Sequence, residues 1–200
     1  MTFPQHITKE EINELPLRKY EGKIVLVTDP DRLDEVFEEL KEHPVVGFDT
    51  EARPSFKRGV RYDTSLIQLS VSRKTYIIRL NYTGLSQAFI DFFADPSIKK
   101  VGISIKDDLK DLRVLCAKHH LTFTSENVLE LNEVAKRLKV NHAGVRKLTA
   151  IFLNFRVSKA QQTSNWENPQ LTEPQLRYAA TDAWVCLEIY RKLESAGYIG

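Results

Sequence analysis

The chain has 200 residues, of which 42% are hydrophobic and 10% aromatic, a composition typical of one soluble globular domain with a sizeable core. A net charge of +2 is too mild to indicate nucleic acid or a membrane as a partner by itself, so a polyanion would need locally placed basic groups or metal ions. Cys116 and Cys186 lack the spacing of a zinc site or a disulfide scaffold, and the sequence shows no signal peptide or membrane span, so we expect a reducing, cytoplasmic location.

The sequence pattern in the first half of the chain predicts an N-terminal arm, five strands and two helices. Residues 1–22 are expected to form an N-terminal arm with a helical turn before Pro16, and residues 23–200 to form the domain. Apolar runs predict strands at residues 23–28, 45–51, 64–72, 74–80 and 99–104, the third and fourth joined as a hairpin. Apolar spacing of three to four predicts helices at residues 29–43 and 85–95.

The second half of the chain is almost wholly helical in pattern. Helices are predicted at residues 106–120, 125–138, 142–154 and 172–197. Strands followed by helices indicate an α/β fold in which helices cover a sheet. Because the linkers between residues 45 and 80 are short, we expect antiparallel neighbours within a single mixed sheet.

Two carboxylates end the second predicted strand. Side chains two apart in a strand point to one face, so Asp49 and Glu51 should stand side by side. Like charges at that spacing raise each other's pKa unless a cation lies between them. The alternatives are a strand end at which water solvates both groups and a site that holds a cation.

The last predicted helix carries a third carboxylate. Thr172 and Gln175 form a capping box that places the helix start, and Tyr178 and Asp182 then lie one turn apart on one face. This helix is apolar nearly all round and should be buried, so Asp182 should be buried too. A buried carboxylate needs a positive partner, which could be an arginine, a helix N-terminus or a metal ion.

A strand also runs into acidic residues in the sequence VGISIKDDLKDL. Capping of the helix start accounts for one aspartate but less well for Asp107 and Asp108 together. Strands in α/β sheets tend to deliver functional groups at their carboxyl ends, so at least one of these should face the crevice of Asp49 and Glu51. Several converging carboxylates form the hard oxygen site that Mg²⁺ or Mn²⁺ prefers, and two such ions serve phosphodiester hydrolysis.

The stretches FDTEA, KDDL and YAATDAW resemble the three exonuclease motifs of the DEDD superfamily, in the branch with tyrosine in the third motif. Each motif alone is weak, but three in order at suitable spacing are specific. The chain is similar to ribonuclease D and Werner-type 3′–5′ exonuclease domains from about residue 22 to 195, including SLIQLS, VRKLTAIFL and SNW. The resemblance implies a ribonuclease-H-like fold with a mixed five-stranded sheet and a pair of divalent ions, Mg²⁺ or Mn²⁺.

The resemblance also implies roles for five residues. Asp49, Glu51 and Asp182 would hold the metal that activates the attacking water. Asp49 would also touch the second metal, which Asp108 supports directly or through water. Tyr178 would orient the nucleophilic water. A phenol stays protonated at neutral pH, so positioning suits Tyr178 better than proton removal.

Two details of the motifs refine these roles. The second-motif aspartate of the family precedes a leucine, matched here by Leu109, so Asp108 is preferred and Asp107 is expected to cap the helix. A sister branch has histidine five residues before the last aspartate. That position is Arg177 here, which favours the tyrosine branch.

Substrate contacts are predicted in two places. The loop ARPSFKRGVRYDTS interleaves basic and aromatic residues, with Arg58 and Arg61 as candidate nucleic-acid contacts, although a solvated loop has the same composition. Lys159 and Trp166 match a lysine and a tryptophan of the family. Lys159 could contact phosphate, whereas Trp166 is expected to be core. Gln162 stands where the family often has arginine.

Together with these carboxylates, the resemblance implies a metal-dependent 3′–5′ exonuclease that releases nucleoside 5′-monophosphates from a nucleic-acid 3′ end, with DNA favoured over RNA. The alternative is a catalytically silent exonuclease fold that binds nucleic acid or protein. An unrelated α/β protein with incidental acids would bind no divalent ion. The chain has no room for the extra domains of its larger relatives, so a stand-alone catalytic domain with no membrane partner is expected.

Overall fold

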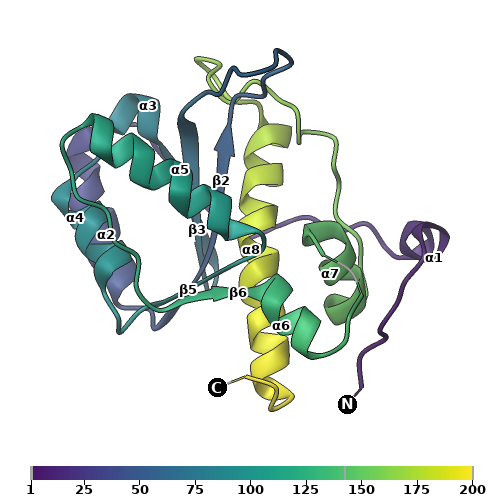
Figure 1. Cartoon of the computed structure of the whole chain (residues 1–200). Helices are drawn as coiled ribbons and strands as arrows, with labels where there is room; N and C mark the ends of the chain where they lie inside the picture. The colour runs from purple at the N-terminus through teal and green to yellow at the C-terminus, as the bar shows by residue number, and fades with distance from the viewer. Residues whose placement is uncertain (1, 142, 200) are drawn as a thin grey trace.

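The computed structural model describes residues 2–141 and 143–199, so the predicted arm start, domain end and helix start at residues 1, 200 and 142 lie outside the described residues. A mixed sheet with the strand order β1-β4-β3-β2-β5-β6 confirms the predicted α/β class (Figure 1). Its strands are β1 (Lys23–Val27), β2 (Val45–Ala52), β3 (Thr64–Val71), β4 (Lys74–Arg79), β5 (Lys99–Gly102) and β6 (Val128–Glu130). The β2–β3 and β3–β4 pairs are antiparallel and the others are parallel, so the predicted hairpin is present.

The sheet has six strands, so the prediction of five strands was wrong by one short edge strand. That strand, β6, pairs in parallel with β5 inside the segment that was predicted to be helical. Three residues are too few to show an alternating pattern, and Val128 and Leu129 also fit helical spacing with the residues that follow. Pairing with β5 overrides that local pattern, and helix α6 (Leu131–Arg137) starts only after Glu130.

Helices cover both faces of the sheet. One face carries α2 (Leu33–Lys41), α4 (Gln87–Ala94) and α5 (Ile105–Lys118), all three predicted from the sequence. Their apolar side chains meet those of the sheet in one cluster that includes Phe48 and Phe93, whose rings lie 5.3 Å apart. Two short helices on this side, η1 (Pro30–Arg32) and α3 (Leu80–Thr83), were not predicted as separate elements.

The opposite face carries α6, α7 (Val145–Leu153) and α8 (Glu173–Ser195). The predicted capping box between Thr172 and Gln175 is present at the start of α8. Helix α8 packs closely on β2, because a Cβ atom on Gly47 would lie 2.2 Å from the backbone oxygen of Ala183. This close approach brings the residues of β2 that share the face of Gly47 against α8.

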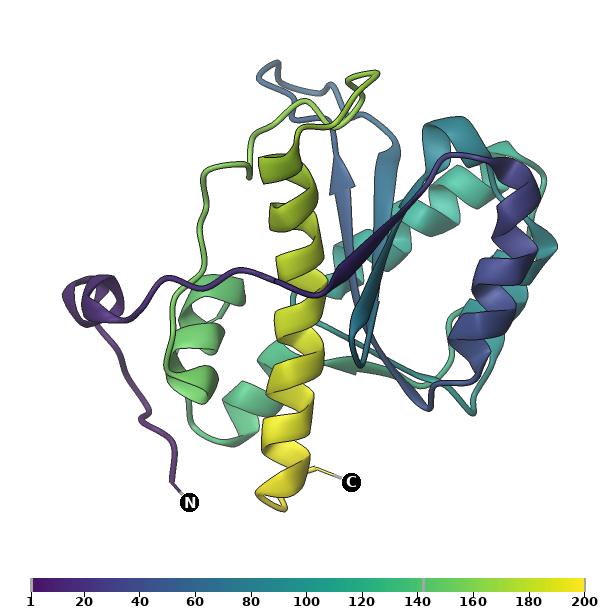
Figure 2. The same ribbon diagram turned by 180° about the vertical axis from the view of Figure 1, so that it is seen from behind.

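The N-terminal arm contains helix α1 (Lys9–Glu14), with a capping box between Thr8 and Glu11, and then crosses α8 to reach β1 (Figure 2). The arm is tied down at that crossing, since the backbone N–H of Tyr20 donates to the Thr181 hydroxyl at 2.9 Å. Among the helices within the described residues, none combines the length and apolar character needed to cross a membrane.

Candidate active site

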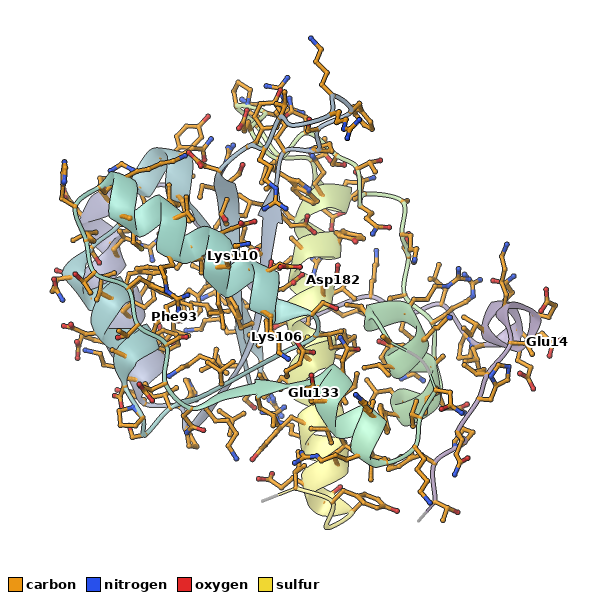
Figure 3. All side chains as sticks on the ribbon, viewed as in Figure 1. Glu14, Phe93, Lys106, Lys110, Glu133 and Asp182 are labelled. Carbon is orange, nitrogen blue, oxygen red and sulfur yellow. The ribbon has the colours of Figure 1, made fainter. Side chains whose placement is uncertain are left out.

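Three carboxylates from distant parts of the sequence meet between β2 and α8. Asp49 and Glu51 alternate with Thr50 along β2 and share the face of the sheet that α8 covers, while Asp182 comes from α8 itself. One carboxylate oxygen of each lies within 4.8 Å of the other two. Figure 3 labels Asp182 on α8, next to the end of β2. The expectation that Asp49 and Glu51 stand on one face and that Asp182 is buried is met.

Burial and mutual repulsion disfavour the charged forms of these acids. Burial, with repulsion from Asp182 and Asp108, raises the pKa of Asp49 well above its usual range and that of Glu51 to about 9. Burial raises the pKa of Asp182 to about 7, against the opposing effects of the Tyr178 hydroxyl and the Lys159 ammonium. Ionising all three carboxylates in so small a space therefore requires added positive charge.

The donor set at this site fits a divalent metal ion. Within the described parts of the chain, none of the three carboxylates forms an ion pair with a lysine, arginine or histidine. The cluster offers only oxygen ligands, the kind that Mg²⁺ and Mn²⁺ prefer. Asp49, Glu51 and Asp182 are therefore the residues that could hold such an ion.

Asp108 lies beside this cluster but outside the mutual 4.8 Å distance of the other three. The Thr50 hydroxyl donates a hydrogen bond to Asp108, which ties the first turn of α5 to β2. Burial raises the pKa of Asp108 to about 6, and its charge contributes to the raised pKa of Asp49 and Glu51. Asp108 thus faces the same site, as the sequence predicted, from a more distant position.

Asp107 does not cap α5, so that expectation was wrong. The N-cap residue is Ser104, which has a left-handed backbone with φ of 65° and makes no side-chain cap. Glu130 supplies the cap instead, because its two carboxylate oxygens accept hydrogen bonds from the backbone N–H groups of Ser104 and Ile105 at 2.9 Å each. A residue at the end of β6 therefore fixes the start of the helix that carries Asp108.

Two aromatic residues border the carboxylates. Burial and the nearby charges of Asp182 and Glu51 keep the pKa of Tyr178 above its usual range, so its hydroxyl stays protonated at neutral pH. Trp166 is fully buried, as expected, with its ring centroid 6.0 Å from that of Tyr178. Its indole N–H forms no hydrogen bond within the described residues, but it is close enough to Glu51 to lower the pKa of that carboxyl against the larger effect of burial. Sequence reasoning missed this effect on Glu51.

The carboxylates open into a cleft of about 900 Å³. Its walls come from the arm (residues 6–9 and Ile12), the start of α7 (residues 143–147) and the segment 157–162, in which Lys159 and Gln162 line the cleft. Arg58 and Arg61 are exposed on the loop after β2 and do not line it. Of the three predicted nucleic-acid contacts, the structure brings only Lys159 to the carboxylates.

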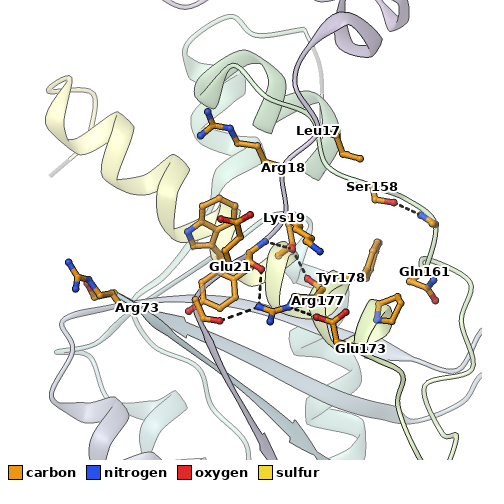
Figure 4. Close-up of a pocket in the computed structure, with 17 residues that line it drawn as sticks. Leu17, Arg18, Lys19, Glu21, Arg73, Ser158, Gln161, Glu173, Arg177 and Tyr178 are labelled. Atoms are coloured by element: carbon orange, nitrogen blue, oxygen red, sulfur yellow. Dashed lines mark hydrogen bonds and ion pairs between the residues drawn. The ribbon is translucent and has the colours of Figure 1, made fainter.

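A second pocket of about 1000 Å³ is lined by the arm before β1, by Ser158, Ala160 and Gln161, and by the first turns of α8 (Figure 4). It shares Ser158 and Tyr178 with the cleft but contains none of the four predicted metal ligands. Its Arg177 is already engaged, since the guanidinium donates to Glu173 at 2.8 Å and to the backbone oxygen of Tyr20 at 3.1 Å. The smaller, carboxylate-lined cleft is therefore the candidate active site.

Known proteins share sequence and fold with this chain. The family model described as 3′–5′ exonuclease matches residues 24–197. The mouse bifunctional 3′–5′ exonuclease/ATP-dependent helicase WRN is 34% identical over 197 residues, which cover 92% of this chain and 14% of that relative. The Nibbler EXO domain of Aedes aegypti superposes with a TM-score of 0.78 at 24% identity, over 90% of this chain and 91% of that one.

A third similar protein is Trypanosoma brucei RNase D, whose structure was solved in complex with RNA U12. It superposes with a TM-score of 0.74 at 18% identity, over 87% of this chain and 63% of that one. This likeness shows a shared fold. The described residues thus combine the fold of solved exonuclease domains with an acidic cleft at the position that the sequence motifs predict.

Proposed function

Because the chain belongs to the 3′–5′ exonuclease family, whose members are enzymes that act on nucleic acid, we propose that it removes nucleotides from a 3′ end by phosphodiester hydrolysis. The products are nucleoside 5′-monophosphates. The observation that carries the proposal is the convergence of Asp49, Glu51 and Asp182 within 4.8 Å inside the cleft. Such a cluster is costly to ionise alone and suits a catalytic divalent centre.

In the proposed mechanism Asp49, Glu51 and Asp182, together with Asp108, would hold two divalent ions, Mg²⁺ or Mn²⁺. When bound, these ions supply an activated water and offset the charge that develops on the reacting phosphate. The protonated hydroxyl of Tyr178 orients the attacking water.

The strand is proposed to enter through the cleft. Lys159 lines the cleft and lowers the pKa of Asp182, which supports a phosphate contact close to the carboxylates. Arg58 and Arg61 lie on the loop outside the cleft, so we propose that they meet nucleic acid only beyond it. We propose DNA ahead of RNA as substrate, and matched oligonucleotides of the two kinds test this order.

The test is digestion of 5′-labelled single-stranded DNA and RNA oligonucleotides of one sequence, with Mn²⁺ or with EDTA. Wild-type protein should give a ladder of products shortened from the 3′ end only with Mn²⁺, faster on DNA. Asp49→Asn should abolish the ladder, whereas Asp107→Asn, the same chemical change on an exposed acid nearby, should leave it intact. Binding without shortening by the wild-type protein would contradict the proposal and favour a silent binding module.

A further inference from the structure

The N-terminal arm forms one wall of the cleft that holds the carboxylates. Residues 6–9 and Ile12 line the same cleft as Asp49, Glu51 and Asp182. These arm residues precede residue 24, where the match to the exonuclease family model begins. The arm therefore contributes to the candidate active site from outside the matched part of the chain.

The wall is fixed in place by contacts made before α1 and within it. Before the helix, the backbone N–H of Asn141 donates to the carbonyl of Gln5 at 3.0 Å. Within the helix, Ile12 is only 2% exposed, and the guanidinium of Arg146 at the start of α7 donates to Asn13. Figures 1 and 2 both show α1 beside α7. The arm is thus a built part of the cleft.

The cleft has an acidic part and a basic part. Its lining includes Lys9 from the arm, Lys147 from α7 and Lys159 from the segment before α8, in addition to the carboxylates. Among the described residues, Lys9 and Lys159 form no ion pair with an acidic side chain. Metal ions would neutralise the acidic part. The basic part is complementary to a repeated anion, such as the phosphates of a polynucleotide backbone.

We propose that the N-terminal arm is part of the nucleic-acid-binding surface, in which Lys9, together with Lys159, contacts backbone phosphates upstream of the scissile one. This inference rests on the proposed function, because it takes the strand's 3′ end to lie at the carboxylates. It assigns to Lys9 a role in holding a long strand and none in the reaction at the terminal phosphate.

The test compares two substrates that differ in upstream phosphates: a 20-nucleotide single strand, and the p-nitrophenyl ester of thymidine 5′-monophosphate, which has none. The variants are Lys9→Glu and, as a matched control, Lys19→Glu, an exposed arm lysine that does not line the cleft. Glutamate in the first turn of α1 is favoured by the helix dipole, so Lys9→Glu should not unfold the helix. Circular dichroism and melting temperature check this.

For Lys9→Glu, we expect the ratio of kcat/KM for the oligonucleotide to that for the ester to fall about fivefold, mainly through KM, with a salt dependence of log(kcat/KM) shallower by about 0.7. Lys19→Glu should keep the wild-type ratio. A wild-type ratio in Lys9→Glu, or an equal loss on both substrates, overturns the arm proposal while the proposed function stands. If wild-type protein hydrolyses neither substrate, the proposed function itself fails.

Discussion

The Tyr178 hydroxyl and the Asp182 carboxylate lie one helical turn apart and influence each other's protonation. Because the tyrosine remains protonated, we assign it to orientation of water and not to removal of a proton. Tyr178→Phe should therefore lower kcat about 100-fold, the scale of loss expected from a misplaced reactant. Steady-state digestion of an oligonucleotide measures kcat.

The control for Tyr178→Phe is the stabilisation of the protein by Mn²⁺, which thermal unfolding measures. The variant keeps every carboxylate, so its stabilisation should match that of the wild-type protein. An unchanged kcat would show that the hydroxyl does not orient the nucleophile. A loss of metal stabilisation would instead assign it to support of Asp182.

The raised pKa of Glu51 makes the metal-free protein sensitive to pH. The pKa of this carboxyl is about 9 in the fold and 4.5 ordinarily, so the unfolded chain loses the proton first as pH rises. The folding contribution of Glu51 is therefore lost progressively between about pH 5 and pH 9. In EDTA, the melting temperature of the wild-type protein should fall relative to that of Glu51→Gln over this range. If the melting temperatures of the two proteins changed in parallel with pH, the raised pKa of Glu51 would be contradicted.

At the level of elements, the site depends on how closely α8 approaches β2. Gly47 has no room for a side chain, since its Cβ would meet the Ala183 oxygen at 2.2 Å and Leu187 at 3.0 Å. Gly47→Ala should destabilise the fold by about 1–3 kcal/mol and weaken Mn²⁺ binding, because it moves Asp49 and Asp182 relative to each other. Chemical denaturation and calorimetric Mn²⁺ titration measure the two effects.

Gly59→Ala is the control for this prediction. A Cβ there meets no atom within 4 Å, so the change carries only the penalty of its left-handed φ of 79°, about 1–2 kcal/mol. It lies on the loop after β2 and should leave Mn²⁺ affinity as in the wild-type protein. Equal Mn²⁺ affinity in Gly47→Ala and Gly59→Ala would show that metal binding does not depend on the contact between β2 and α8.

Elements with a long, regular pattern could be predicted from the sequence, and those defined by pairing could not. The alternation in β2 and the capping box of α8 placed Asp49, Glu51 and Asp182 correctly. By contrast, Val128–Glu130 becomes a strand only through its pairing with β5. Glu130 caps α5 from 25 residues away, so no local pattern could have replaced Asp107 in that role.

For the whole molecule, the carboxylate cluster predicts that divalent ions couple to stability. A ligand that binds only the folded state at 100 times its Kd adds about 2.7 kcal/mol. In a domain of this size such a gain raises the melting temperature by about 5–10 °C. Saturating Mn²⁺ should produce this rise over EDTA in the wild-type protein, as followed by differential scanning calorimetry.

The same calorimetric rise should be absent in Asp182→Asn and present in Asp107→Asn. An equal rise in both variants would place the bound ion outside the cluster. The arm itself was predicted from the sequence, but its place in the wall of the cleft was not. Nothing in residues 1–22 showed that Lys9 and Ile12 would line the cleft, because that arrangement follows from contacts with α7 and Asn141 far along the chain.

The most direct test of the central claim is anomalous diffraction from crystals of the protein soaked in Mn²⁺. The account predicts two anomalous peaks roughly 3.5–4 Å apart, bounded by Asp49, Glu51 and Asp182 with Asp108 beside the second. Crystals of Asp49→Asn should lose both peaks. Fully soaked wild-type crystals with no peak among these carboxylates, or with peaks only elsewhere, would contradict it.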